Sequence, residues 1–134
     1  MLLGLHLRTH RPSCRVMTSP GVIPHLRAQF NHRVPDLGVS CAPFTGARSM
    51  ADPVLLVEIL SPSNEAKTRA NAWAYATIPS VQEVLILSGT GVRGEILRQG
   101  DETPVIVVGN ETLCLHSIGY EGRLVDFYAT TDLT

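Results

Sequence analysis

A chain of 134 residues, of which 44% are hydrophobic and 17% charged, is long enough for one domain with one modest core. No apolar run reaches the length of a membrane span, and the formal net charge is only −1. The three cysteines are widely spaced and contain no Cys-x-x-Cys pair, so they predict neither a zinc site nor a disulfide framework. A reducing, cytoplasmic setting fits this cysteine usage best.

Charge is distributed unevenly along the chain. Residues 1–35 contain five basic and no acidic residues, whereas residues 36–134 contain six basic and twelve acidic residues, giving +5 and 6 − 12 = −6. The five basic residues are Arg8, Arg11, Arg15, Arg27 and Arg33. A basic segment beside an acidic site suits a polyanionic substrate. A solvated face explains the same pattern equally well, and an Arg-rich targeting peptide is a third interpretation.

The first half of the chain predicts a helix followed by three strands. The helix covers residues 2–8 and begins abruptly, and the first strand covers 14–17. Residues 34–41 alternate, with Leu37, Val39 and Cys41 on one face and Asp36 on the other. A loop of small residues over 42–52 follows. Residues 54–60 are apolar on both faces except at Glu58, which indicates a central strand that is buried on both sides.

The second half predicts one helix and several short strands. The helix covers residues 63–77, with Ser63 as its cap and Glu65 in its first turn. Its predicted inward stripe consists of Ala66, Ala70, Trp73 and Thr77. Strands are expected over 81–88, 92–98, 104–108 and 112–116, the first two as a hairpin, and a short helix over 124–128. His116 is expected to be a core histidine. The order of elements predicts one mixed α/β or α+β domain over residues 1–134, with a sheet flanked by helices.

Asp36 and Glu58 are the candidate functional residues. A glutamate inside an apolar strand is costly to bury unless it is neutral, paired with a cation or bound to a metal. Two carboxylates brought together on adjacent strands make a natural Mg²⁺ site. Two simpler interpretations stay open. Asp36 can bond the backbone near Pro35, and Glu58 can pair with Arg33 or Lys67.

Three stretches of sequence together carry a resemblance. They are Val-Pro-Asp at 34–36, Val-Glu-Ile-Leu-Ser-Pro-Ser at 57–63 and Ile-Pro-Ser-Val-Gln-Glu at 78–83. They resemble the Uma-type putative restriction endonucleases, part of the PD-(D/E)XK nuclease-like superfamily. The resemblance implies a restriction-endonuclease-like core, Mg²⁺ or Mn²⁺ held by Asp36, Glu58 and the Ile59 carbonyl, and hydrolysis of DNA phosphodiester bonds. It also implies a homodimer, which short exposed strands near the C-terminus would join.

The sequence departs from the family pattern in two respects. Leu60 stands where the general motif has its catalytic lysine, and the chain's single lysine is Lys67 on the following helix. Lys67 is either a relocated catalytic residue or an ordinary solvated helix lysine. Relatives usually begin with a further helix and strands, so we expect a truncated N-terminus. The alternative function is therefore an inactive module with a nuclease fold that binds nucleic acid or a protein.

Overall fold

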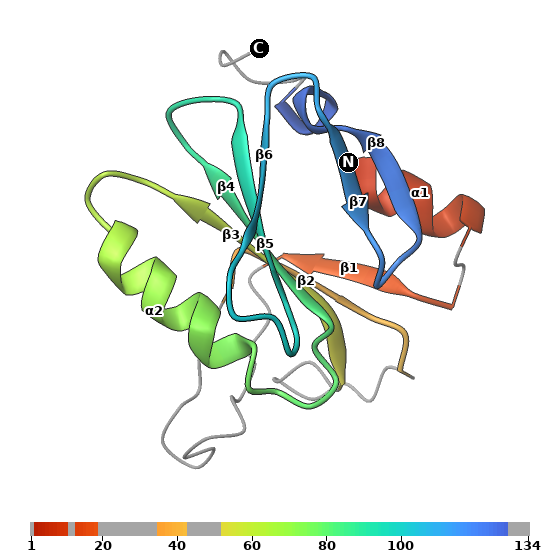
Figure 1. Ribbon diagram of the computed structural model, residues 1–134. Coiled ribbons are helices and arrows are strands. Elements are labelled where there is room, and N and C mark those ends of the chain that lie inside the picture. The colour runs from red at the N-terminus through yellow and green to blue at the C-terminus, as the bar shows by residue number, and fades with distance from the viewer. Residues whose placement is uncertain (1, 11–12, 19–34, 43–51, 129–134) are drawn as a thin grey trace.

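The computed structural model describes residues 2–10, 13–18, 35–42 and 52–128 and has a mixed α+β fold, as predicted (Figure 1). Six strands form one sheet in the order β1-β2-β3-β4-β5-β6. They are β1 Arg15–Thr18, β2 Leu37–Ser40, β3 Pro53–Leu60, β4 Glu83–Ser88, β5 Arg93–Arg98 and β6 Val105–Val108. Only β3 and β4 pair in parallel, and every other neighbouring pair is antiparallel. The parallel pair requires a crossover, which the helix after β3 supplies.

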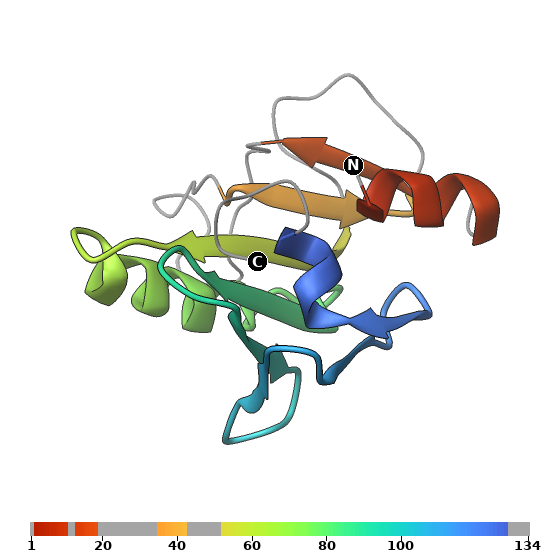
Figure 2. The same cartoon turned by 90° about the horizontal axis from the view of Figure 1, so that it is seen from above.

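The remaining elements cover the two faces of this sheet. They are the helices α1 Leu2–His10 and α2 Glu65–Tyr75, the hairpin strands β7 Thr112–Leu115 and β8 Tyr120–Arg123, and the 3₁₀ helix η2 Leu124–Tyr128. Figure 2 shows α2 on one side of the sheet and α1, the hairpin and η2 on the other. None of the described helices is long and apolar enough to cross a membrane.

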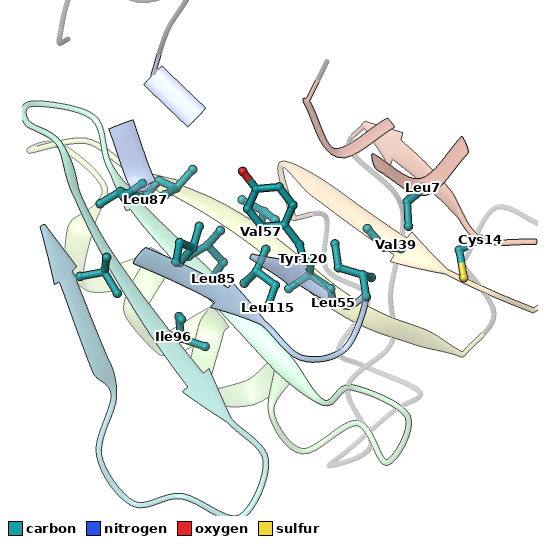
Figure 3. Packing of buried hydrophobic residues seen from close by; sticks show 14 of the residues in the cluster. Leu7, Cys14, Val39, Leu55, Val57, Leu85, Leu87, Ile96, Leu115 and Tyr120 are labelled. Atoms are coloured by element: carbon teal, nitrogen blue, oxygen red, sulfur yellow. The ribbon is translucent and has the colours of Figure 1, made fainter. Parts of the chain in front are cut away.

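Each face of the sheet has its own hydrophobic core. The core beneath α1, the hairpin and η2 contains Leu55, Val57 and Leu85 from the central strands (Figure 3). The core beneath α2 contains the alternate residues of the same strands, among them Leu56 and Ile86. Strand β3 is therefore central and buried on both sides, as its apolar run predicts.

The structure corrects the predicted bounds and orientation of α2. The helix begins at Glu65, and Ser63 does not cap it. Asn64 precedes the helix, but its Oδ1 accepts the Ser61 N–H at 2.9 Å instead of capping α2. The buried residues are Thr68, Ala72 and Tyr75, with the expected i, i+4, i+7 spacing but a different phase.

The predicted inward stripe of α2 instead faces outward, and Trp73 is 48% exposed. Alanines on several sides of the helix give the apolar pattern no clear phase. Tertiary contacts set the rotation instead: Tyr75 is fully buried, and Arg69 bonds Glu95 on β5.

Glu83 at the start of β4 joins the hairpin to the sheet, a role that its place at the end of the 78–83 stretch did not predict. Its side chain is 1% exposed and accepts four hydrogen bonds. Oε1 accepts from the N–H and hydroxyl of Ser117 at 2.8 and 2.7 Å, and Oε2 accepts from Arg98 Nε and the His116 N–H at 3.0 and 3.1 Å. His116 is itself exposed in the turn between β7 and β8, so its prediction as a core histidine was wrong.

A disulfide links Cys14 to Cys41, contrary to the prediction that the cysteines form none. In the β1–β2 ladder Arg15 pairs with Ser40, so Cys14 and Cys41 occupy the next opposed position beyond the strands. Their spacing along the chain carries no sign of this pairing. The antiparallel register alone brings them together.

Reduction of the Cys14–Cys41 bond is expected to lower the free energy of unfolding by about 3 kcal/mol. The bond joins residues 27 positions apart. Breaking it raises the conformational entropy of the unfolded chain and so favours unfolding. Calorimetry with and without dithiothreitol should show a melting temperature lower by roughly 10 °C in the reduced protein. A reducing cytosol would favour that less stable form.

A Cys14→Ser variant should melt at the same temperature with and without reductant. Replacing the free Cys114 by serine should preserve the difference. Equal melting temperatures for oxidised and reduced wild type would contradict the prediction.

Candidate functional site

Asp36 and Glu58 meet where the β2–β3 ladder ends. The last paired residues are Leu37 and Val57, so the next residues outward, Asp36 and Glu58, lie opposite each other. The Asp36 N–H donates to Glu58 Oε1 at 2.9 Å, and the Ile59 N–H donates to Asp36 Oδ2 at 2.7 Å. The structure thus brings together the two carboxylates and the main chain of Ile59, three of the four residues that the sequence marks as the site.

The two carboxylates differ in environment. Asp36 is exposed, whereas Glu58 is 6% exposed on the α2 side of the sheet. Burial raises the pKa of Glu58 from 4.5 to about 7, the Asp36 N–H opposes this rise, and the Asp36 charge adds to it. Near neutral pH, Glu58 is therefore divided between its protonated and ionised forms, and a cation at the pair would favour the ionised form.

No basic side chain among the described residues pairs with Glu58. Lys67, one of the two structural partners considered for it, is exposed and makes no such contact. The other, Arg33, lies outside the described residues, as do Arg11 and Arg27 of the basic segment. Within the described part of the chain, Glu58 is thus a buried carboxylate with hydrogen bonding but no counter-charge. Such a group is costly to keep ionised.

The rotation of α2 determines which of its basic residues faces the carboxylate pair. Lys67 and Arg69 flank the buried Thr68, at about 100° to either side of it around the helix. Arg69 reaches Glu95 on β5, so Lys67 lies on the opposite flank, toward β2 and Asp36. Glu58 and Glu95 both pair with Ile86 in register, which places their side chains on this same face of the sheet. Lys67 shares the face with the pair but does not contact it.

The oxygen atoms available at the Asp36–Glu58 pair are suitable ligands for a hard divalent cation. Each carboxylate uses one oxygen for a backbone N–H, and no described donor bonds the second oxygen of either group. No group of three or more His, Cys, Asp or Glu that could hold a metal occurs in the described segments. A cation here would therefore take two carboxylates, the Ile59 carbonyl and water. Mg²⁺ accepts such a set, because it commonly binds one or two carboxylates and keeps several waters.

An ion-pair cluster on the other flank of α2 was not foreseen. The buried Glu95 accepts two bonds from Arg69, at 3.1 and 2.8 Å, and one from Arg93 at 3.0 Å. These contacts lower the pKa of Glu95, chiefly through the Arg69 hydrogen bonds. The alternation of Arg93, Glu95 and Leu97 on one strand face was the available signal. The cluster fixes α2 against β5 and thereby sets the direction of Lys67.

Comparison with known proteins identifies one sequence family. The model of Uma2, described as "Putative restriction endonuclease", matches residues 1–119. The uncharacterized protein slr1290 of Synechocystis sp. (strain ATCC 27184 / PCC 6803 / Kazusa) is 33% identical over 95 residues, covering 66% of this chain and 50% of that protein. The chain thus spans about half the length of this curated relative.

A solved structure has the same fold. It is the crystal structure, at 1.96 Å resolution, of a putative nuclease belonging to DUF820 from Anabaena variabilis ATCC 29413. The TM-score is 0.74 with 14% sequence identity, and the match covers 96% of this chain and 76% of that one. At this identity the likeness establishes the fold alone.

Proposed function

This chain belongs to the Uma2 family of putative restriction endonucleases and has a nuclease-like fold, and from that premise we propose that it is a metal-dependent endonuclease that hydrolyses DNA phosphodiester bonds. The observation that carries the proposal is the contact between the exposed Asp36 and the buried Glu58 at the end of the β2–β3 ladder. A buried carboxylate beside a second carboxylate, with no described cation, is the arrangement that a divalent metal stabilises.

In the proposed site each residue has a separate task. Asp36 and Glu58 hold the cation together with the main-chain carbonyl of Ile59. When bound, Mg²⁺ or Mn²⁺ polarises the scissile phosphate and offsets negative charge in the transition state. Lys67, on the flank of α2 toward Asp36, can extend to orient the attacking water or neutralise developing charge.

A second candidate function is a module that keeps the fold but has lost catalysis. The observation that favours it is the absence of a described lysine in contact with the carboxylates, since Leu60 occupies the general motif position and Lys67 is exposed. Such a module would bind nucleic acid or a protein. It would still be expected to bind a divalent cation through Asp36 and Glu58.

Cleavage of supercoiled plasmid separates the two candidates. Wild-type protein with Mg²⁺ or Mn²⁺ should convert supercoiled DNA to the nicked form, and excess EDTA should stop the reaction. Asp36→Asn and Glu58→Gln should each reduce the rate by at least about 100-fold, because each removes a charged ligand. Lys67→Ala should lower the rate constant more than the affinity for DNA if Lys67 acts on the reacting groups.

Glu121→Gln is the matched control, since Glu121 is an exposed glutamate on β8, outside the site. It should cleave at the wild-type rate. Equal nicking by all variants would reveal a contaminant. No nicking by wild type, together with a Mg²⁺-dependent rise in melting temperature that requires both carboxylates, would support the inactive module instead.

A further inference from the structure

Two histidines lie one turn apart on helix α1. The ring centroids of His6 and His10 are 4.8 Å apart, and the ring planes are tilted by 40°. Leu7 is 1% exposed and sets the rotation of the helix, so both histidines lie on one flank of it, about 40° from each other around the axis. Arg8 is exposed and lies about 160° from either. Two imidazoles at this spacing on a helix can bind the same metal ion.

The turn between β7 and β8 fixes the tautomer of His6. His6 Nε2 lies 2.9 Å from the carbonyl oxygen of Ile118. A carbonyl oxygen only accepts hydrogen bonds, so Nε2 carries the proton and donates it. In the neutral ring, Nδ1 then keeps a lone pair that a metal can take. Histidines that bind metals characteristically donate their other N–H to a carbonyl or carboxylate in this way, which orients the ring and makes it a stronger ligand.

His10 provides a second ring nitrogen beside His6. Its side chain is exposed and makes no hydrogen bond to any residue that the structure describes, so its ring is able to turn. Two nitrogens bound to one Zn²⁺ lie at most about 4.2 Å apart, because each bond is about 2.1 Å long. Rings at the observed separation therefore need only a small rotation to bind the same ion. Neither histidine forms an ion pair with a described acidic residue that would compete for it.

We propose that His6 and His10 form a binding site for Zn²⁺ or a similar borderline transition metal, separate from the carboxylate pair. Imidazole nitrogens prefer such metals, whereas the oxygen atoms of Asp36 and Glu58 prefer Mg²⁺. The two sites lie on opposite sides of the sheet, since Glu58 faces α2 and α1 covers the other face (Figure 2). Water fills the remaining coordination positions at the histidines.

A metal at this site would hold α1 against the β7–β8 hairpin, beside which it lies (Figure 1). Binding takes Nδ1 of His6 and leaves Nε2 bonded to Ile118, so the ion strengthens the existing contact between helix and turn. The edge of the Tyr120 ring packs against His6 at 5.2 Å between centroids and keeps the ring in place. This inference goes beyond the proposed nuclease function and does not rest on it.

Long-range ¹H–¹⁵N NMR of the histidine rings, in full-length protein titrated with Zn²⁺, tests the site. Metal-free His6 should be the tautomer protonated at Nε2. Zn²⁺ should shift the resonances of His6 Nδ1 and of one His10 ring nitrogen along the same saturable curve, because both nitrogens bind the same ion. A histidine with a merely structural role would show the tautomer without the shift.

His10→Asn should raise the dissociation constant measured at His6 by at least about tenfold, since it removes one of two ligands. His116→Asn is the matched control, because His116 is exposed in the β7–β8 turn and bonds Glu83 only through its main chain. It should bind Zn²⁺ at His6 like wild type, and so should Glu58→Gln, which separates this site from the carboxylate pair. Circular dichroism verifies that each variant is folded.

Three results would overturn the proposal. One is the absence of a saturable shift at His6 Nδ1. Another is a shift that His10→Asn leaves unchanged, which would mean that His6 binds alone. The third is an equal loss of affinity in His116→Asn.

Discussion

Replacement of Glu83 by glutamine is expected to lower the free energy of unfolding by about 3–5 kcal/mol, the largest loss among the substitutions considered. All four groups that bond Glu83 are donors: the Arg98 Nε, the Ser117 hydroxyl and the two main-chain N–H groups of His116 and Ser117. A glutamine must turn its NH₂ toward two of these donors. It therefore loses two bonds and leaves polar groups buried without partners.

The loss should also have a location. Glu83 on β4 holds the turn between β7 and β8, and Arg98, whose Nη2 also bonds the Cys114 carbonyl, loses its only described charge partner. Amide hydrogen exchange should therefore accelerate first in β7 and β8. In contrast, the sheet core around β3 should keep its protection until global unfolding.

Urea unfolding of wild type, Glu83→Gln and Glu121→Gln measures this effect. Glu121 is exposed and makes none of these bonds, so its variant should lie within about 0.5 kcal/mol of wild type. A loss below about 1 kcal/mol for Glu83→Gln would mean that the four hydrogen bonds contribute little net stability.

Replacement of Glu58 by glutamine is expected to raise the free energy of unfolding of the metal-free protein above pH 7. The change in this free energy should be about 3 kcal/mol more favourable there than at pH 4.5. The pKa of Glu58 is raised from 4.5 in the unfolded chain to about 7 in the fold, and each unit corresponds to about 1.4 kcal/mol. Below pH 4.5 the group is protonated in both states. As the pH rises from 4.5 to 7, the unfolded chain loses the proton first, so wild-type stability falls, and above pH 7 the deficit is constant.

The measurement is the difference in unfolding free energy between Glu58→Gln and wild type, taken in urea at several pH values between 4.5 and 8.5. Using the difference removes contributions from carboxylates that both proteins share, such as Glu95. Glu121→Gln should show no such pH dependence. A difference that is constant with pH would contradict the raised pKa.

Divalent cations provide a related test of the pair. Because bound Mg²⁺ favours the ionised form of Glu58, its apparent affinity should increase up to tenfold per pH unit below pH 7 and level off above it. Calorimetric titration in wild type should show proton release on binding, and Glu58→Gln should show none. This readout depends on metal binding alone and remains informative if the protein does not cleave DNA.

Much of the architecture follows from local sequence patterns. The apolar run over residues 54–60 predicts a central strand, and the structure has β3 there with both faces buried. The resemblance to the Uma-type family, carried by the stretches at Asp36, Glu58 and Glu83, is confirmed by the family match. The proximity of Asp36 and Glu58 could also be expected, because residues that end adjacent strands meet at one edge of a sheet. These properties depend on periodicity and chain order, which a single sequence displays directly.

Other properties were decided only by tertiary contacts. The sequence by itself determined that α2 is a helix and that its buried residues recur at i, i+4 and i+7. The rotation of the helix about its own axis depended on contacts with residues far away in the sequence. Arg69 bonds Glu95, Tyr75 packs in the core, and Trp73 remains exposed. The Cys14–Cys41 bond and the four contacts of Glu83 likewise join residues far apart in the chain. A local pattern indicates which face of an element is apolar. The rotation of a helix, the register of a strand and the partner of a side chain depend instead on interaction energies between residues far apart in the chain.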